Sequence, residues 1–473
     1  MKNLRIAACI LCVLLVYAFF ASDGTWHFRT LQWFEAHSDS LGADYYARQA
    51  EGFRTGHLYI AASVDPRFET LKDPYNFDER SAAGIEGLWD ASYFRGHYYL
   101  YFTPLPVILF YLPFRLIFGA YPPDSLAAVF FAGWSFVMAL LFLRRAIQKR
   151  VWLWAFVAAF GNVVIFLMPD IRIYEIAAMC GMAMSITWAW ALLRFVELPS
   201  TRSAMWMSLW LALSIAARPN LLVLIIPTAI AIWLVRNLRL VRAALLPLAV
   251  TMLVLLGYNT ARFHKPFEFG RTYQLEFTSM VGRRLCGICN GKEALRFINS
   301  TEHYLFWPPS FDRHFPWVTL QLAHLDPDVS APLGADTILG VVPMLPLVLG
   351  GSLFALVLGL RRDSATTAAT HIMFGAWLTL AALSTCWWVV ARYSLDFMVL
   401  MSVATAVCLE RGLALLEQCG LRTLLLRITI VILAIYSILL GILLGFEGLG
   451  GSFRRFNPSL YQSIGHTLHV KVR

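Results

Sequence analysis

Long apolar runs separated by short connections dominate the chain. The first run follows Lys2 and Arg5 and continues to Ala21, and residues 243–258 read AALLPLAVTMLVLLGY. An apolar run of about 20 residues is long enough to cross a bilayer as a helix. Further runs lie at about 123–143, 151–168, 174–196, 203–217, 220–235, 243–259, 337–360, 367–389, 394–413 and 424–445. With the first run they predict eleven transmembrane helices, and therefore an all-α polytopic membrane protein.

The basic residues of the short connections predict how the bundle is oriented across the membrane. Lys and Arg collect in short cytoplasmic loops, so the N-terminus is expected inside and the tail from Phe446 outside. The first run has the shape of a signal peptide, but Phe19 would occupy the −3 position of a cleavage site after Ala21. A small residue is preferred there, so we expect an uncleaved helix. The inner connections contain Arg144, Arg145, Lys149, Arg150, Arg202, Arg236, Arg239, Arg242, Arg361, Arg362 and Arg422.

Three segments leave alternatives open. The runs 203–217 and 220–235 are about 15 residues each, shorter than a full span, so they form either two spans or one broken hairpin. Residues 103–119 are apolar but contain three prolines and Arg115. Counting this segment as a span would place the basic residues 144–150 outside. We therefore expect it to be re-entrant or interfacial at the outer surface.

Two long segments are expected outside the membrane, from residue 22 to about 122 and from about 260 to 336. Both are rich in Trp, Tyr and Phe, which argues against disorder. The chain then divides into an N-terminal catalytic transmembrane module over 1–260, which includes the outer loop 22–122. A second extracytoplasmic loop over 261–336 follows, and then C-terminal transmembrane helices with an outer tail over 337–473.

Composition agrees with a membrane location and removes several function classes. Hydrophobic residues make up 59% of the chain and charged residues 14%, against about 25% charged in soluble domains. The net charge of +10 is scattered, so no nucleic-acid partner is expected. No P-loop, G-x-S-x-G or H-E-x-x-H motif occurs, so the sequence does not support ATP-driven transport or zinc proteolysis. The pair Cys286 and Cys289 favours a local disulfide over a zinc site, because a second pair is missing from the same loop.

Asp44 is the first candidate for chemistry. Ala43, Ala47, Ala50 and Phe53 have helical spacing, which predicts an amphipathic helix on the outer face with Asp44 near its start. A carboxylate there is stabilised by the helix N-terminus. Asp44 is therefore either a first-turn acid or a catalytic base directed at the membrane surface.

A second group of charges joins two spans at the outer side. Asp170, Arg172 and Glu175 lie within six residues of one another. Ionisable residues at the mouth of an apolar helix are functional candidates. The alternative is a local pair between Arg172 and one of the acids that closes a tight turn.

Further polar residues lie at other outer span ends. An anionic lipid head group would explain the cations, because Arg and Lys form strong charge-assisted bonds to phosphate. Snorkelling to lipid phosphates in general is the alternative. Asp90 and Arg95 lie in an aromatic stretch that suits a sugar or an interfacial belt. The cations and the adjacent tyrosine are Arg218, Arg262, Lys265, Arg392 and Tyr393.

The order of these motifs resembles the bacterial membrane glycosyltransferases of the GT-C class, close to the protein-mannosyltransferase and aminoarabinose-transferase type. The resemblance rests on Asp-Tyr-Tyr at 44–46, DASYFRGHYYLYFTPLP at 90–106 and RIYEIA at 172–177, and on AARPNLL, YNTARFHKPFEFG and RYSLDF further on. It implies a catalytic acid in the first outer loop, which maps to Asp44, with Asp170 or Glu175 as a second acid.

The chain departs from this pattern in two places. Asp44 is followed by Tyr45 where the family commonly has paired acids. The lysine-proline-proline of some relatives appears only as Thr103-Pro104 and Pro106.

The resemblance and the residues together predict an inverting glycosyltransferase of the cytoplasmic (inner) membrane, with its site facing the periplasm or exterior. The donor would be a polyprenyl-phosphate-linked sugar and the acceptor a lipid, glycan or protein. No cofactor is required by any motif, and a divalent metal is compatible with the site. The alternatives are a non-enzymatic transporter or flippase of lipid-linked saccharides, and a ligase that uses a diphosphate donor.

Overall fold

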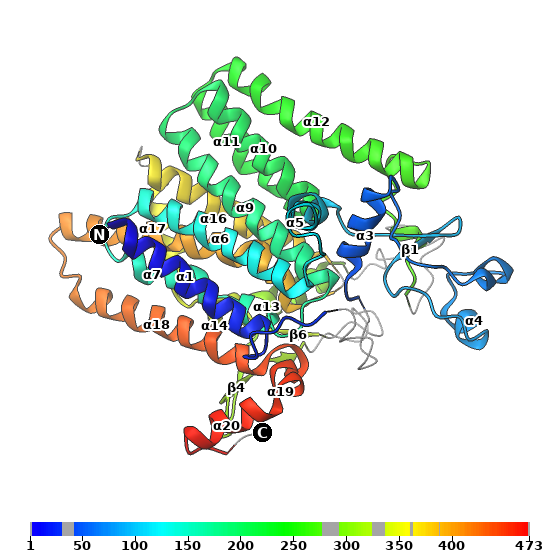
Figure 1. The fold of residues 1–473 in the computed structure, drawn as a ribbon. Helices are drawn as coiled ribbons and strands as arrows, with labels where there is room; N and C mark the ends of the chain where they lie inside the picture. Colours follow the sequence, from blue (N-terminus) through cyan, green and yellow to red (C-terminus); the bar gives the residue numbers. More distant parts are fainter. Residues whose placement is uncertain are drawn as a thin grey trace.

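The computed structural model describes residues 2–30, 42–276, 293–323, 336–359, 363–386 and 388–471. Long helices lie side by side, and the short elements of the outer segments gather at the bundle end opposite the N-terminus (Figure 1). The helices of the N-terminal part are α1 (Lys2–Ala21), α6 (Asp124–Ala146), α7 (Val151–Phe160), α8 (Val164–Leu167), α9 (Ile173–Glu197), α10 (Thr201–Ala217), η3 (Pro219–Leu224), α11 (Ile225–Val235) and α12 (Leu238–Phe263).

The C-terminal helices complete the bundle and are followed by a short helical tail. They are α14 (Val341–Met344), α15 (Leu347–Leu358), α16 (Ser364–Ser384), η6 (Ala391–Ser394), α17 (Leu395–Gln418), α18 (Leu424–Glu447), η7 (Leu449–Gly451), α19 (Ser452–Phe456) and α20 (Pro458–Thr467).

The outer segments contain short helices and small two-stranded sheets. These elements are α3 (Tyr45–Arg54), η1 (Pro66–Thr70), α4 (Phe77–Ala82), β1 (Ser92–Phe94), β2 (His97–Tyr99), η2 (Val107–Tyr111), α5 (Leu112–Phe118), η4 (Arg271–Tyr273), α13 (Glu293–Phe306), β3 (Ser310–Phe311), β4 (Val318–Thr319), β5 (Gln321–Leu322) and β6 (Thr337–Ile338).

Among the described residues, seven helices are long and apolar enough to cross a membrane. Four shorter apolar helices lie at Val107–Phe118, Val151–Leu167, Pro219–Val235 and Leu347–Leu358. The predicted all-α, multi-pass membrane architecture is therefore confirmed, whereas the count of eleven spans stays a prediction. The long spans are Leu4–Ala21, Asp124–Ala146, Ile173–Glu197, Leu238–Phe263, Ser364–Ser384, Ala391–Gln418 and Leu424–Phe456.

Helix α9 is the centre of the bundle. Its apolar window is 94% buried, and it packs against α6, α10, α16 and α17. Its sequence contains several alanines, Gly181 and Ser185 among larger side chains, and small residues allow helices in a membrane to approach closely. Elements before and after the second outer loop therefore share one core.

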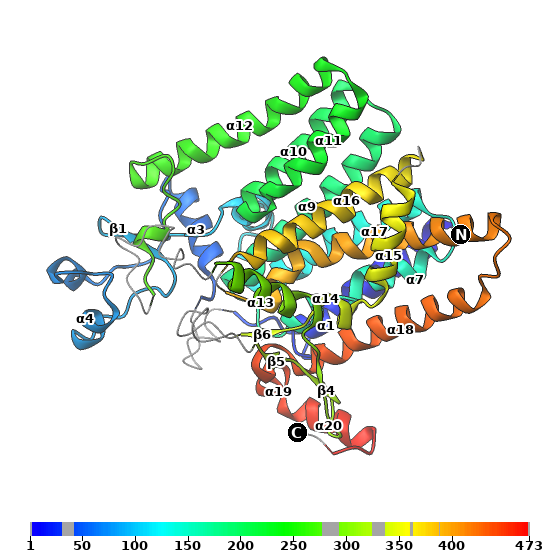
Figure 2. The same ribbon diagram turned by 180° about the vertical axis from the view of Figure 1, so that it is seen from behind.

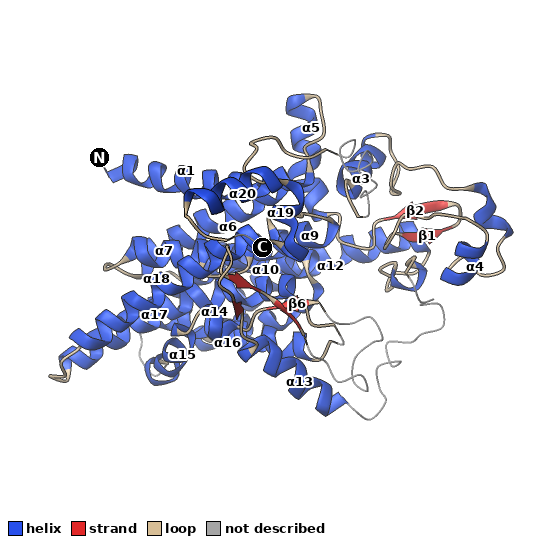
Figure 3. Cartoon of the chain, turned by 90° about the horizontal axis from the view of Figure 1, so that it is seen from below, coloured by secondary structure: helices blue, strands red, loops and turns tan. Residues whose placement is uncertain are grey.

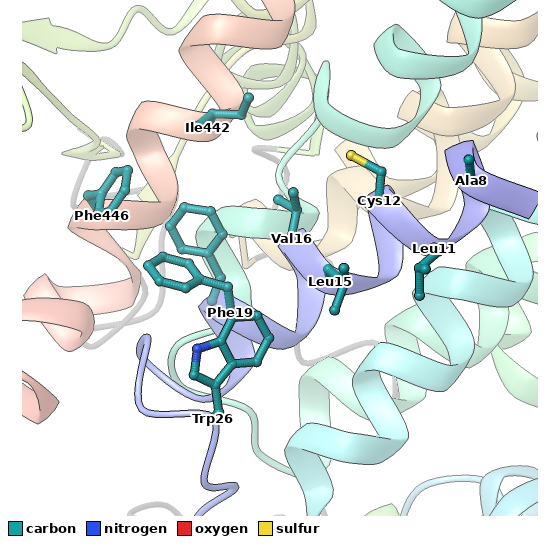
Figure 4. Close-up of a pocket in the computed structure, with 10 residues that line it drawn as sticks. Ala8, Leu11, Cys12, Leu15, Val16, Phe19, Trp26, Ile442 and Phe446 are labelled. Atoms are coloured by element: carbon teal, nitrogen blue, oxygen red, sulfur yellow. The ribbon is translucent and has the colours of Figure 1, made fainter. Parts of the chain in front are cut away.

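Helices α12 and α18 lie on opposite edges of the bundle (Figures 1 and 2). Only 11% of the apolar window of α12 is buried, and this helix packs mainly on α10. Helix α18 packs on α7 and α8. An apolar groove of about 530 Å³ lies between α1 and α18, and the rings of Phe19, Trp26 and Phe446 lie at one end of it (Figure 4).

The two outer segments are joined by a small antiparallel hairpin. Strands β1 and β2 pair in the register Ser92↔Tyr99, and Ser92 forms a further bridge to Gln274 of the second segment. Strands β5 and β6 pair separately, close to α13 and α14 (Figure 3). The second outer segment thus contributes Gln274 to the β1–β2 hairpin and strand β5 to the pair with β6.

Two predicted runs are interrupted, each for a local reason. The run 151–168 breaks between α7 and α8, where the Asn162 amide donates to the Ala158 carbonyl oxygen and accepts from the Val164 N–H, both at 2.8 Å. The run 337–360 begins with strand β6 and breaks before α15 at Pro346, which lacks an N–H to donate. Residues 103–119 form a short π-helical and α-helical segment with exposed Leu116 and Ile117.

Gly441 provides a test of the packing of α18. A β-carbon at this position would overlap the carbonyl oxygen of Phe160. Gly441→Ala should therefore destabilise the protein by roughly 1–3 kcal/mol, measured as a lower midpoint of thermal unfolding in detergent. Gly257→Ala on α12 is the matched control, because no atom lies within 4 Å of the added β-carbon. Equal midpoints for the two variants would show that α18 is not tightly packed there.

Candidate functional site

Asp44 lies at the N-cap position of α3, as the spacing predicts. Its φ of 64° is in the left-handed region, and its side chain does not cap the helix. A non-glycine residue in this region is strained and is often found at functional sites. The side chain is half-buried while Ala43 and Tyr45 on either side are buried. The surrounding structure thus holds a half-buried acidic residue in an unfavourable backbone conformation.

A second carboxylate supports this conformation. Asp124, at the start of α6, accepts a hydrogen bond of 2.7 Å from the Asp44 N–H and one of 2.5 Å from the Tyr111 hydroxyl. The Gly42 carbonyl oxygen accepts from the Ile173 N–H at 3.1 Å. The segment around Asp44 is thereby fixed to the outer ends of α6 and α9.

The acids before α9 have fixed partners. Asp170 accepts from Arg172 Nε at 2.7 Å and from Arg455 Nη2 at 2.8 Å. Glu175 accepts from the Arg172 N–H at 3.1 Å, and this bond closes the first turn of α9. The local pair between Arg172 and Asp170 is therefore present, and Glu175 is only 1% exposed.

Arg392 connects this group to the second outer segment. Its Nη1 atom is 3.6 Å from Glu175 Oε1 and 3.4 Å from Asp336 Oδ2, and its guanidinium lies 4.8 Å from the Tyr174 ring centroid. Both ion-pair distances exceed the usual charge-assisted hydrogen bond of about 2.7–2.9 Å. Arg392 is half-buried and faces two acids without a short bond to either.

Asp90 has a separate and more buried environment. Its carboxylate accepts from the Tyr174 hydroxyl and, at 2.9 Å, from the Gln274 amide. Burial raises the pKa of Asp90, while the hydrogen bonds from Tyr174 and Gln274 oppose the shift. The backbone N–H of Asp90 donates to the Leu275 carbonyl oxygen at 3.0 Å. Asp90 therefore ties the β1–β2 hairpin to the segment after α12.

Arg218 forms a buried ion pair across the bundle. Its Nη2 atom is 2.9 Å from Asp396 Oδ2, which also accepts from the Asn220 amide at 2.8 Å. The guanidinium lies 5.0 Å from the Tyr393 ring centroid. Gly181 of α9 leaves room for the Arg218 side chain, because a β-carbon there would overlap it. The pair fixes the backbone next to Arg392.

The remaining predicted residues lie around the hairpin. Arg262 is buried and donates to the Leu100 carbonyl oxygen and to Asn259, both at 2.7 Å. Arg95 Nη1 lies 3.0 Å from His264 Nε2, and Lys265 is exposed. In the described part of the chain, neither Arg95 nor Lys265 forms an ion pair with an acid.

Several residues of this region were not predicted. Asp124 follows two prolines at the start of a helix, and an acid in a first turn is a signal that could have indicated it. Gln274 and Asn220 have no sequence signal, because a single amide in a polar stretch is unremarkable. Cys286 and Cys289 lie outside the described residues. No group of three or more His, Cys, Asp or Glu that could hold a metal ion is present where the structure describes the chain.

No protein-family model and no curated protein matches the chain. Three solved structures of the Archaeoglobus fulgidus oligosaccharyltransferase are similar over most of it. The apo form has a TM-score of 0.48 and 15% identity over 94% of this chain and 56% of the solved chain. The complex with an inhibitory peptide and a dolichol-phosphate has a TM-score of 0.43 and 14% identity, and covers 96% of this chain and 56% of the solved chain. The form tethered to an acceptor peptide has a TM-score of 0.41 and 13% identity, and covers 96% of this chain and 55% of the solved chain. The chain thus spans a little over half the length of these structures, and TM-scores below 0.5 do not assign a function.

Asp396→Asn tests the buried pair. Arg218 is 9% exposed, and breaking a buried pair from one side costs about 3–5 kcal/mol. We expect a clear fall in the midpoint of thermal unfolding. Arg54→Gln is the control: it removes the exposed pair with Glu51, in which the Arg54 side chain is 48% exposed, so its midpoint should stay nearly unchanged. An unchanged midpoint in Asp396→Asn would contradict a structural role for the pair.

Proposed function

We propose that the chain is an inverting membrane glycosyltransferase that moves a sugar from a polyprenyl-phosphate donor to an acceptor outside the cytoplasmic membrane. The observation that carries the proposal is the half-buried acidic residue Asp44. It is held in a left-handed conformation by the backbone bond to Asp124, at the bundle end where Arg392 lies among acids and aromatic rings.

Asp44 is the base in this proposal. It accepts the proton of an acceptor hydroxyl while that oxygen attacks the anomeric carbon of the sugar. The bond from this carbon to the donor phosphate breaks, and polyprenyl phosphate leaves with the electron pair. Asp124 and Tyr111 do not take part in the proton transfer; their hydrogen bonds position Asp44.

Arg392 is the best candidate to receive the departing phosphate. Its long contacts to Glu175 and Asp336 can be exchanged for phosphate oxygens, which guanidinium binds strongly. Arg218 is already paired with Asp396, and its guanidinium lies over the ring of Tyr393. Arg262 is committed to the hairpin, while Arg95 and Lys265 remain available for the acceptor or the lipid surface.

Asp90, Tyr174 and Gln274 offer carboxylate, ring and amide groups of the kind that bind sugars. The basic inner connections favour a site on the periplasmic or outer side. A lipid, glycan or protein acceptor reaches that side, and the transfer is compatible with a divalent metal without requiring one.

Asp44→Asn is the decisive variant. Purified protein in membranes is given a panel of radiolabelled polyprenyl-phosphate sugars, and transfer to extracted envelope acceptors is measured. We expect transfer by the parent and a fall of about 10²–10⁴-fold in a folded Asp44→Asn protein, the usual contribution of a general base. Asp78→Asn is the matched control, because Asp78 is an exposed acid in the same outer segment.

Other outcomes assign other functions. Equal transfer by the parent and Asp44→Asn would move the base to Asp170 or Glu175. Consumption of a diphosphate donor only would identify a ligase. If neither donor is consumed while lipid-linked sugar crosses the bilayer, the transporter alternative is correct.

A further inference from the structure

A pocket lined by indole rings and a few polar side chains lies at the other end of the bundle, between α6, α9 and the start of α10. Its volume is about 590 Å³. The Asp44 group is at the opposite ends of α6 and α9, so the pocket is separate from the proposed catalytic site. It is lined by Trp134, Met138, Thr187, Trp190, Ala191, Arg194, Leu198, Ser200, Arg202, Ser203, Trp206 and Trp210.

The walls of the pocket are indole rings in fixed positions. Trp134 donates through Nε1 to Thr187 Oγ1 at 3.0 Å and meets Trp210 edge-on at a centroid distance of 5.9 Å. Trp206 stacks on Trp210 at 6.3 Å, and Trp206 is 48% exposed. Tryptophan is enriched where a membrane meets water, because its ring is apolar and its N–H is polar.

The mouth of the pocket carries excess positive charge. Glu197 accepts from Arg194 at 2.6 Å and from Arg145 at 2.8 Å. One carboxylate therefore balances only one of the two guanidinium charges. Arg202 is exposed and has no ion pair in the part of the chain that the structure describes. The hydroxyl groups of Ser200 and Ser203, which are hydrogen-bonded to each other at 3.0 Å, line the same pocket. Guanidinium and hydroxyl groups together are suitable donors for phosphate oxygens.

We propose that this pocket binds an anionic phospholipid of the leaflet opposite the Asp44 group. The head-group phosphate contacts Arg202, Arg194 and the Ser200 hydroxyl, and one acyl chain lies against Trp206 and Trp210. The proposal commits to a lipid because charged donors and an apolar wall occur in one pocket, and because basic pockets between spans on the cytoplasmic side bind such head groups. It does not depend on the proposed glycosyl transfer.

Native mass spectrometry of the detergent-solubilised full chain tests the proposal. Phosphatidylglycerol and phosphatidylcholine with identical acyl chains are compared as probes. We expect the parent to retain phosphatidylglycerol in preference, and Arg202→Gln to weaken this binding about fivefold, since one cation near the surface contributes about 1 kcal/mol. Trp206→Leu should weaken the binding of both lipids.

Arg239→Gln is the matched control. Arg239 is also an exposed cation of an inner connection and does not line the pocket. It should leave phosphatidylglycerol binding unchanged. An equal loss in Arg202→Gln and Arg239→Gln would show general surface attraction and overturn the proposal. Equal retention of the two lipids by the parent, or no loss in Arg202→Gln, would overturn it as well.

Discussion

The hydrogen bond from the Ile173 N–H to the Gly42 carbonyl oxygen joins the first outer segment to the most buried helix of the bundle. Inside a bilayer, the free N–H groups of a helix end must find partners within the protein. Helix α9 satisfies its first turn with Glu175 and with this carbonyl group. The position of Asp44, two residues after Gly42, is a consequence of that requirement.

The charges at this end of the bundle are arranged in two ways. Arg218 and Asp396 form a short, buried pair that is fully committed. Arg392 faces two carboxylates at longer distances and is half-buried. A group with weak existing bonds loses little when an anion replaces them, whereas a short buried pair is costly to separate. By this geometry Arg218 is a structural cation and Arg392 is the cation that we propose to bind a phosphate, although their sequence contexts are alike.

Local patterns predicted the apolar helices and the helix that starts beside Asp44, because these depend on residues close in sequence. Hydropathy also placed the Asp170–Glu175 turn between two helices. The pairing of Asp44 with Asp124 could not be predicted, since the two residues are joined by chain folding across the whole first outer segment. The same holds for Gln274 and Asp90. Arg262 looked like a phosphate ligand from its charge alone, and only its contacts show that it holds the backbone at Leu100.

Helix α12 has a mechanical consequence for the site. Its 26 residues make a helix about 39 Å long, while the hydrocarbon core is about 30 Å thick. A long helix adapts to a thinner core by tilting, and few neighbours oppose a tilt of α12. Its C-terminal end at Phe263 is followed by a short connection to Gln274, and Gln274 holds Asp90. The thickness of the surrounding bilayer thus becomes a variable that acts on the geometry around Asp90.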